Sequence, residues 1–315
     1  MARTTAAFAL LTPGLFRYAA RVSYDGLAYS GWQKQSGDRA ALVADAPSRR
    51  QMPPPSVQGQ LEYALARRFA GRPYAPSTFG ASRTDAGVHA AGQVAHIDLG
   101  EAVDGDALAL SLNALLPADV RVLAVAPAPD PTPAQVAAGH AWHAMHNARG
   151  KLYTYRLATG PVYDPLRRRT QAHVTHEPLD LEALRRALEL FEGPNDFRAF
   201  ANGMVKKEAA LRGLGLLGPG CLMDTRRTVF SVRLVVERDD GPGGQEARVE
   251  VSLDGALYQM VRNVVGAAVA VARGRLNADA VRLALATGNR PSQHFVAAAP
   301  AHGLTLTEVY YDGGL

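Results

Sequence analysis

The central feature of the sequence is one run of small and polar residues: Gly80-Ala81-Ser82-Arg83-Thr84-Asp85-Ala86-Gly87-Val88-His89-Ala90. Residues of this kind favour turns over helix or strand interiors, because their side chains hydrogen-bond to the local backbone. The run joins two strand-like segments, at about 76–82 and 91–99. We therefore expect a tight loop that presents Arg83 and Asp85. Two interpretations stay open for this pair: a functional site, or an Asx-turn at Asp85 beside a surface arginine.

The rest of the first half surrounds this loop with an alternating pattern of strands and helices. Apolar and polar residues alternate over 16–24, which predicts a half-buried strand. Ser56 is a good N-cap for a helix that ends before Gly71. A second helix is expected at about 104–116 and a last strand at 120–125. The order is therefore strand, helix, strand, strand, helix, strand.

The second half repeats that order. Alternation predicts strands, and apolar stripes at helical spacing predict helices. The expected strands are at about 153–157, 230–236, 249–253 and 304–310, and the expected helices at 181–191, 257–273 and 278–287. Both halves match the split βαβ, or ferredoxin-like, order. We predict an α+β protein of two such domains, whose antiparallel sheets join into one platform with helices behind it and a cleft between the domains.

The expected domain organisation follows from these elements. Residues 1–16 are predicted to be a flexible leader, 17–128 an N-terminal domain that carries the Asp85 loop, and 129–315 a C-terminal domain. Two stretches lack the surrounding periodicity and are interpreted as insertions, at about 36–55 and 201–223. We expect loop character in both, because the first is rich in proline and the second in glycine.

Composition narrows the class of protein. The 315 residues are 47% hydrophobic, which is typical of a globular chain, and the net charge of +5 with a pI near 9.4 suits a polyanionic partner. Cys221 is the only cysteine, so no internal disulfide can form. No stretch approaches the roughly 20 apolar residues that span a bilayer. A soluble protein of the cytoplasm, without a membrane partner, is the expectation.

Three further features carry chemistry. Tyr153 and Tyr155 alternate on a strand that begins with Lys151, and aromatic side chains beside cations can stack bases and hold phosphates; simple tyrosine packing is the alternative. Arg262 lies in a very apolar helix and needs an anionic partner, in a site or in a structural ion pair.

The third feature is the set of basic pairs and triplets, which would form a phosphate track on a flat sheet or would simply be solvated. These are Arg67-Arg68, Arg167-Arg168-Arg169 and Arg226-Arg227. The histidines at 140, 143 and 146 have metal-like spacing, but no cysteine or acidic partner lies between them, so we expect no metal site.

Several of these residues resemble the motifs of the tRNA pseudouridine synthase A family. The catalytic motif of that family is similar to the Gly80–Ala90 run followed by Gly92-Gln93-Val94. The other matching segments follow in the same order along the chain. They are Tyr24-Asp25-Gly26, Gly31-Trp32-Gln33, Ser56-Val57-Gln58, Asn113-Ala114-Leu115-Leu116-Pro117, Trp142-His143-Ala144, Tyr153-Thr154-Tyr155, Gly193-Pro194-Asn195-Asp196-Phe197 and Met260-Val261-Arg262-Asn263-Val264-Val265-Gly266. The resemblance extends over about 17–311.

The resemblance implies an isomerase that converts uridine to pseudouridine at positions 38, 39 and 40 in the anticodon stem-loop of tRNAs, as a homodimer and without cofactor or metal. Asp85 matches the catalytic aspartate of the family, and Tyr153 the tyrosine that stacks on the target uracil. Arg262 matches the basic residue that pairs with the aspartate, and Arg83 the arginine beside the flipped nucleotide.

The sequence also departs from the family. Ser82 stands where glycine is usual, and Met145-His146 replace the usual Arg-Phe. Two other functions stay open at this point. A non-catalytic RNA-binding module would share the element order, although neither half carries an RNP1 pattern. A metal-assisted hydrolase would use Asp85, His89 and the histidines at 140–146.

Overall fold

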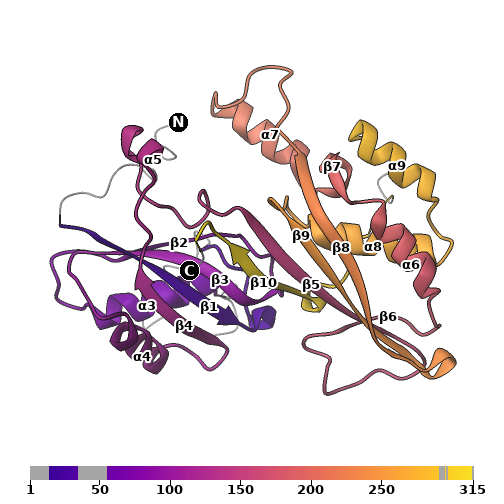
Figure 1. The fold of residues 1–315 in the computed structure, drawn as a ribbon, viewed down its shortest axis with the longest axis horizontal. Helices are drawn as coiled ribbons and strands as arrows, with labels where there is room; N and C mark the ends of the chain where they lie inside the picture. The colour runs from indigo at the N-terminus through magenta and orange to yellow at the C-terminus, as the bar shows by residue number, and fades with distance from the viewer. Residues whose placement is uncertain (1–13, 35–54, 291–294, 296, 314–315) are drawn as a thin grey trace. The chain divides into compact units, whose positions relative to one another are not determined.

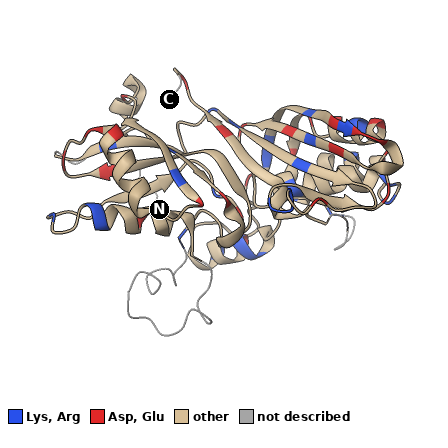
Figure 2. Ribbon diagram, turned by 90° about the horizontal axis from the view of Figure 1, so that it is seen from below, with Lys and Arg blue, Asp and Glu red and all other residues tan. Residues whose placement is uncertain are grey.

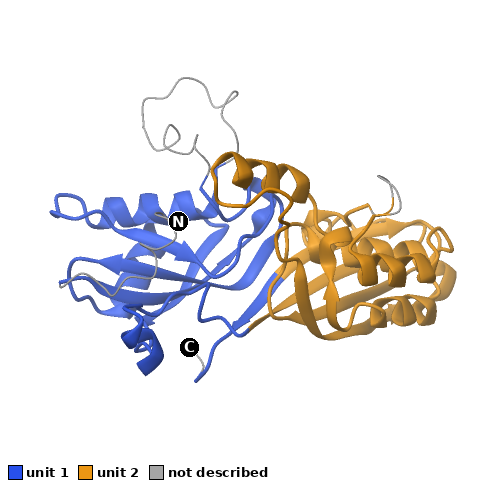
Figure 3. Cartoon of the chain, turned by 90° about the horizontal axis from the view of Figure 1, so that it is seen from above, with its two compact units in different colours: residues 1–149, 306–315 blue, residues 150–305 orange. Residues whose placement is uncertain are grey.

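The computed structural model describes residues 14–34, 55–290, 295 and 297–313. The chain divides into two compact units: residues 1–149 with 306–315, and residues 150–305 (Figure 3). Nearly all of the predicted leader at 1–16, and all but the end of the predicted insertion at 36–55, lie outside the described residues. No helix among the described residues has the length and hydrophobicity needed to cross a membrane.

The first unit is built on an antiparallel sheet. Its strands are β1 (Phe16–Tyr24), β2 (Ser77–Gly80), β3 (His89–Leu99), β4 (Val120–Pro127) and most of β10 (Leu304–Tyr310) (Figure 1). β1 lies between β4 and β3, so that Ala20 is opposite both Val125 and Ala95. β2 pairs with the 95–98 end of β3. The strand at 16–24 and the two strands on either side of the Asp85 loop are therefore confirmed.

Two helices supply most of the helical core of this unit. They are α3 (Val57–Arg68) and α4 (Gly105–Leu115), which contact each other, and a short α5 (Pro133–Ala137) follows. Ser56 caps α3 as predicted, since its side chain accepts a hydrogen bond from the Gly59 amide. Leu61, Leu65 and Leu112 are fully buried, because the apolar stripe of each helix faces inward.

The second unit is also a sheet with helices. Its strands are β5 (Gly150–Thr159), β6 (Ala172–Thr175), β7 (Gly193–Asp196), β8 (Arg226–Asp239) and β9 (Gln245–Leu253). Their order is β5-β9-β8-β7 with antiparallel pairs, and β6 pairs in parallel with β5. The helices are α6 (Leu181–Glu189), α7 (Met204–Gly213), α8 (Met260–Ala272) and α9 (Ala278–Thr287). α8 is almost wholly buried and packs on α6, in agreement with its apolar sequence.

One expectation needs correction: the stretch at 201–223 is not a loop throughout, because α7 occupies 204–213 and is anchored by the buried Glu208. The domain boundary at 128/129 stays a prediction. The two compact units divide at Arg149/Gly150, and the first unit also includes residues 306–315. The physical reason is that β10 is a neighbour of β3 in the sheet, so the end of the chain completes the unit where it began.

Candidate active site

The segment 81–88 follows β2, and buried and accessible residues alternate along it from Ser82 to Asp85. Ser82 and Thr84 are only 5% and 8% exposed, whereas Arg83 is exposed and Asp85 is partly exposed. Arg83 and Asp85 therefore both keep solvent-accessible surface, while the residue before each of them is buried. The fold thus presents the two predicted site residues together.

A buried glutamine holds the start of this segment. Gln93 lies in β3 and has no exposed surface. Its Oε1 accepts a hydrogen bond from the Ser82 amide (3.2 Å), and its Nε2 donates to the Ser82 carbonyl (2.7 Å). Both backbone groups of Ser82 are satisfied by one side chain, which fixes the residue that precedes Arg83.

The segment 24–33 holds the other end. The Trp32 amide donates to the Thr84 carbonyl (3.2 Å), and the hydroxyl groups of Thr84 and Tyr24 are 2.8 Å apart. The Gly87 amide donates to the Tyr29 carbonyl (3.4 Å). Thr84, the residue between Arg83 and Asp85, is therefore anchored both by its backbone and by its side chain.

A close approach between these two segments depends on Gly31. Its φ of +107° is unfavourable for other residues, and a Cβ atom built on it would lie 2.4 Å from the Thr84 oxygen. Any side chain at this position would push the Asp85 loop away from its support. The Gly31-Trp32-Gln33 motif, noted in the sequence only for its resemblance, thus has a physical role.

A tight turn follows Asp85. The Val88 amide donates to the Asp85 carbonyl (3.1 Å), and Gly87 has a φ of +78°. A positive φ at the third residue is typical of a type II turn and favours glycine. Gly87 therefore permits the turn that follows Asp85.

The other two predicted residues belong to the second unit. Tyr153 lies on β5 opposite Val251 and is only 4% exposed. Arg262 lies in the first turn of α8 and is partly exposed. Its Nε donates to the Ala299 carbonyl (2.7 Å), and the Ala299 amide donates back to the Arg262 carbonyl (3.0 Å). α8 and the 299 region thus hold this arginine between them.

The histidines of the first unit form an aromatic cluster. The ring of His143 lies 4.5 Å from that of His96 and 4.4 Å from that of His146. Burial lowers the pKa of His96 to about 2 and that of His143 to about 4, so both are neutral at pH 7. The Nδ1 atom of each accepts a backbone amide. Among the described residues, no group of three or more His, Cys, Asp or Glu side chains is placed to hold a metal ion.

Comparison with known proteins identifies the relationship. Residues 187–312 match the family model described as tRNA pseudouridine synthase. The chain is 36% identical to tRNA pseudouridine synthase A of Nitratidesulfovibrio vulgaris (strain DSM 19637 / Miyazaki F), over 94% of this chain and 99% of that protein. It is 38% identical to the Streptomyces griseus protein of the same name, over 95% of this chain and 89% of the relative. The chain belongs to the tRNA pseudouridine synthase A family. This confirms the relationship that the sequence motifs indicated.

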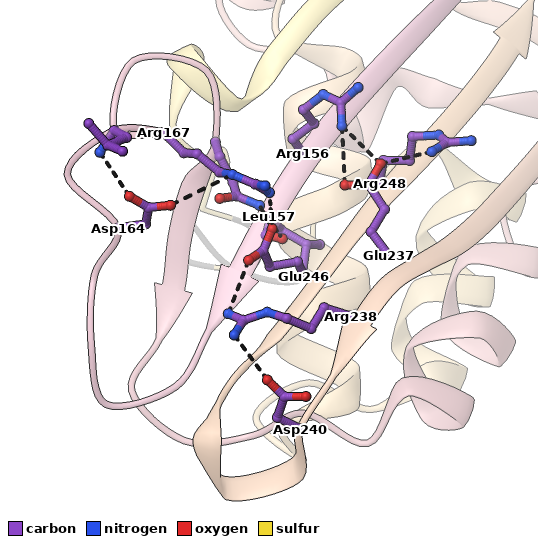
Figure 4. Close-up of polar contacts among 11 residues, drawn as sticks. Arg156, Leu157, Asp164, Arg167, Glu237, Arg238, Asp240, Glu246 and Arg248 are labelled. Carbon is purple, nitrogen blue, oxygen red and sulfur yellow. Dashed lines mark hydrogen bonds and ion pairs between the residues drawn. The ribbon is translucent and has the colours of Figure 1, made fainter.

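In a member of the tRNA pseudouridine synthase A family, Lys and Arg side chains that are not already paired with carboxylates are the candidates for contacts with RNA phosphates. Figure 2 shows basic and acidic residues interspersed along the strands of the second unit. Arg156 and Arg248 both bond to Glu237 (Figure 4). Arg248 also bonds to Glu250. These cations are already neutralised by carboxylates of β8 and β9.

The basic runs noted in the sequence differ from one another. Arg167 pairs with Glu246 and approaches Asp164, so this member of the triplet is also neutralised (Figure 4). Arg226 and Arg227 instead line a polar cavity of about 300 Å³. A phosphate-binding role is therefore better supported for the 226–227 pair than for Arg167.

Proposed function

We propose that this chain converts uridine to pseudouridine at positions 38, 39 and 40 in the anticodon stem-loop of tRNAs. Membership of the tRNA pseudouridine synthase A family supports the reaction and the tRNA substrate. The observation that carries the site is the 81–88 segment, which leaves Arg83 and Asp85 accessible while hydrogen bonds hold the buried Ser82 and Thr84.

The reaction defines what these residues must do. The bond between N1 of uracil and C1′ of the ribose breaks, the base turns, and C5 bonds to C1′; the proton on C5 is lost and N1 gains one. Substrate and product have the same atoms and oxidation state, so no redox cofactor is needed. Asp85, as an ionised carboxylate, acts as the nucleophile toward the sugar. A neighbouring guanidinium, which we assign to Arg262, favours that ionised form.

The target base must leave the RNA stack, at a cost of a few kcal/mol. Arg83, beside Asp85, is positioned to hold the backbone of the flipped nucleotide. Tyr153 stacks on the released uracil and keeps it in the site. Because only 4% of Tyr153 is exposed, its ring must become accessible when the tRNA binds.

The finer architecture is part of the same proposal. The first unit has the order strand, helix, strand, strand, helix, strand, with the sheet order β4-β1-β3 and β2 beside β3, which supports a ferredoxin-like domain. We infer that the second domain is its counterpart, and that a cleft between the two brings Tyr153 and Arg262 to Asp85. We also infer a cytoplasmic homodimer in which one tRNA contacts both subunits.

The test is to map pseudouridine in tRNA after incubation with wild-type protein and with Asp85→Asn and Asp85→Ala. We expect modification at the three positions with wild type, none with either variant, and unchanged tRNA binding. Asp106→Asn, an exposed aspartate at the start of α4, is the matched control and should keep full activity. Substantial turnover by the Asp85 variants would reject the role of Asp85, and inactivity of the wild type would reject the function.

A further inference from the structure

Lys151 is an unusual lysine. It lies on β5 opposite Leu253 and is only 9% exposed. Among the described residues, its ammonium group makes no hydrogen bond and no ion pair. Lysine is almost never buried without a partner, because removing an ammonium group from water is costly. The little exposed surface of Lys151 and the lack of a bonded carboxylate leave its charge available to an anion.

The charged groups that act on Lys151 come from two elements. Arg227 on β8 repels the ammonium, and Asp254, after β9, attracts it. Burial has the larger effect, and together these groups lower the pKa of Lys151 to about 8. The Asp254 carboxylate accepts the Thr228 amide (3.0 Å), and the Arg227 guanidinium donates to the neighbouring Arg226 carbonyl. The two cations thus lie near each other without a carboxylate bonded to either.

A cavity opens at this place. Its volume is about 300 Å³, and its polar lining includes Arg226, Arg227 and Thr228 together with two aspartates, Asp196 and Asp254. Both aspartates accept hydrogen bonds from the protein, Asp196 from Thr225 and Asp254 from the Thr228 amide. Guanidinium and hydroxyl groups are well suited to bind a phosphate group. Lys151 does not line the cavity itself, but its ammonium group interacts electrostatically with two residues that do, Arg227 and Asp254.

We propose that Lys151 and Arg227 bind a backbone phosphate of the tRNA close to the target uridine. This inference rests on the proposed function, because it takes the substrate from there. Tyr153, which we expect to stack on the uracil, lies two residues along β5 on the same strand face, about 6.6 Å away at the usual strand rise. The phosphate neutralises the buried ammonium, which explains why the fold tolerates it.

The test measures binding of tRNA to the full chain carrying Asp85→Asn, so that no turnover occurs. Lys151→Met and Arg227→Gln are added singly, and fluorescence anisotropy is recorded over a range of KCl concentrations. Each variant should weaken binding and reduce the slope of log affinity against log salt by about 1, since each removes one phosphate contact. Lys151→Arg keeps the charge and should keep the slope.

Two further readouts separate this role from a structural one. The tRNA affinity of the chain that retains Lys151 should fall as pH rises from 7 to 9.5, because the ammonium group loses its proton. Lys151→Met should lose that dependence. Arg248→Gln, whose cation is already paired with Glu237 and Glu250, is the matched control and should leave the slope unchanged.

Unchanged slopes and pH dependence in both variants would overturn the proposal, whatever the activity of the wild type. Reduced slopes in these variants, together with a wild-type chain that forms no pseudouridine, would support the phosphate site and reject the proposed function instead. Titration with inorganic phosphate alone tests whether the site binds free phosphate instead of a phosphate of the RNA backbone. Tight binding of free phosphate, retained when tRNA is present, would overturn the assignment to the RNA backbone.

Discussion

The side-chain amide of Gln93 hydrogen-bonds to both the amide and the carbonyl of Ser82. One residue earlier, the Ala81 amide still bonds to the Val94 carbonyl, as in a strand ladder. At Ser82, where the segment after β2 separates from β3, the Gln93 side chain therefore replaces the hydrogen bonds that the β3 backbone would make. This allows the chain to diverge toward Arg83 and Asp85 without leaving buried polar groups unsatisfied.

Replacing Gln93 with glutamate should make activity depend on pH in a new way. A protonated carboxyl reproduces both hydrogen bonds, whereas an ionised one repels the Ser82 carbonyl. Burial raises the pKa of a carboxyl group, so the change falls near neutral pH. We expect kcat relative to wild type to fall by roughly 10- to 100-fold as pH rises from 6 to 8.5, since small displacements of reacting groups have effects of this size. KM should change little, because phosphate contacts dominate tRNA affinity.

Gln93→Leu provides the comparison, because leucine makes neither bond at any pH. Its kcat should be low throughout, with no recovery in acid. Steady-state kinetics from pH 6 to 8.5 measure both variants, and circular dichroism verifies that they are folded. Equal activity of Gln93→Glu and wild type over the whole range would show that the Ser82 clamp does not position Asp85.

Gly31→Ala should disrupt the loop by direct contact. The new methyl group would meet the Thr84 oxygen at 2.4 Å and the Asp85 carbonyl carbon at 3.1 Å. Gly71→Ala is the matched control, because Gly71 also has a positive φ (+80°) but has nothing within 4 Å of an added Cβ. Both variants incur the backbone penalty of about 1 to 2 kcal/mol. Only Gly31→Ala should also lower kcat, by on the order of 100-fold.

Urea denaturation and pseudouridine formation measure the two effects separately. If Gly71→Ala and Gly31→Ala lost equal stability and both kept wild-type kcat, the approach of segment 24–33 to Thr84 would have no bearing on catalysis.

Local patterns were sufficient to predict elements with strong periodicity. The Ser56 cap and the spacing of Leu61 and Leu65 define α3 within the sequence itself. α7 was missed because its anchor is not local: Glu208 pairs with Arg198, ten residues earlier, across an intervening turn. The short strand β7 was missed because it is defined by pairing with β8 rather than by alternation.

The same distinction applies to the site. Arg83 and Asp85 stand in a polar run, so the sequence alone marks them as candidates. Gln93 did not stand out, because a glutamine in a strand carries no sign of which backbone groups it will meet. The roles of Trp32 and Gly31 depend on a contact with Thr84, more than 50 residues away in sequence. Only the folded backbone reveals such supports.

Lys151→Met should stabilise the protein at pH 7. The pKa of Lys151 is about 8 in the folded state against 10.5 for an ordinary lysine. Between pH 8 and 10.5 the unfolded chain binds more protons than the folded chain, so the stability of the wild-type protein rises with pH across this window. Below pH 8 the full cost of the buried charge, about 3 kcal/mol, lowers that stability. Methionine has a similar length and no charge, so the variant should be more stable by about 1 to 3 kcal/mol at pH 7 and lose that advantage near pH 10.5.

Urea denaturation at several pH values between 7 and 10.5 measures this difference. Lys206→Met, at an exposed position of α7, is the control and should show a constant difference from wild type. A loss of stability in Lys151→Met at pH 7 would indicate that the ammonium is well satisfied in the free protein, contrary to the structure.

Glu208→Gln should loosen α7 without unfolding the rest of the second unit. Glu208 is 2% exposed and accepts two hydrogen bonds from Arg198 (2.8 Å each) and one from the Met223 amide (2.8 Å). The bonds from Arg198 and Met223 lower the pKa of this carboxyl to about 2, so it is ionised at neutral pH. Glutamine removes the charge and leaves a guanidinium without its carboxylate, which favours local opening.

Trypsin reports this opening, because Lys206, Lys207 and Arg212 lie within α7. We expect cleavage at these sites to accelerate on the order of tenfold in Glu208→Gln at pH 8, which corresponds to about 1.4 kcal/mol of local stability. Glu182→Gln, at an exposed position in the first turn of α6, is the matched control and should be cleaved like wild type. Cleavage of Glu208→Gln at the wild-type rate would mean that packing of Met204 alone holds the helix, and that the ion pair with Arg198 is dispensable.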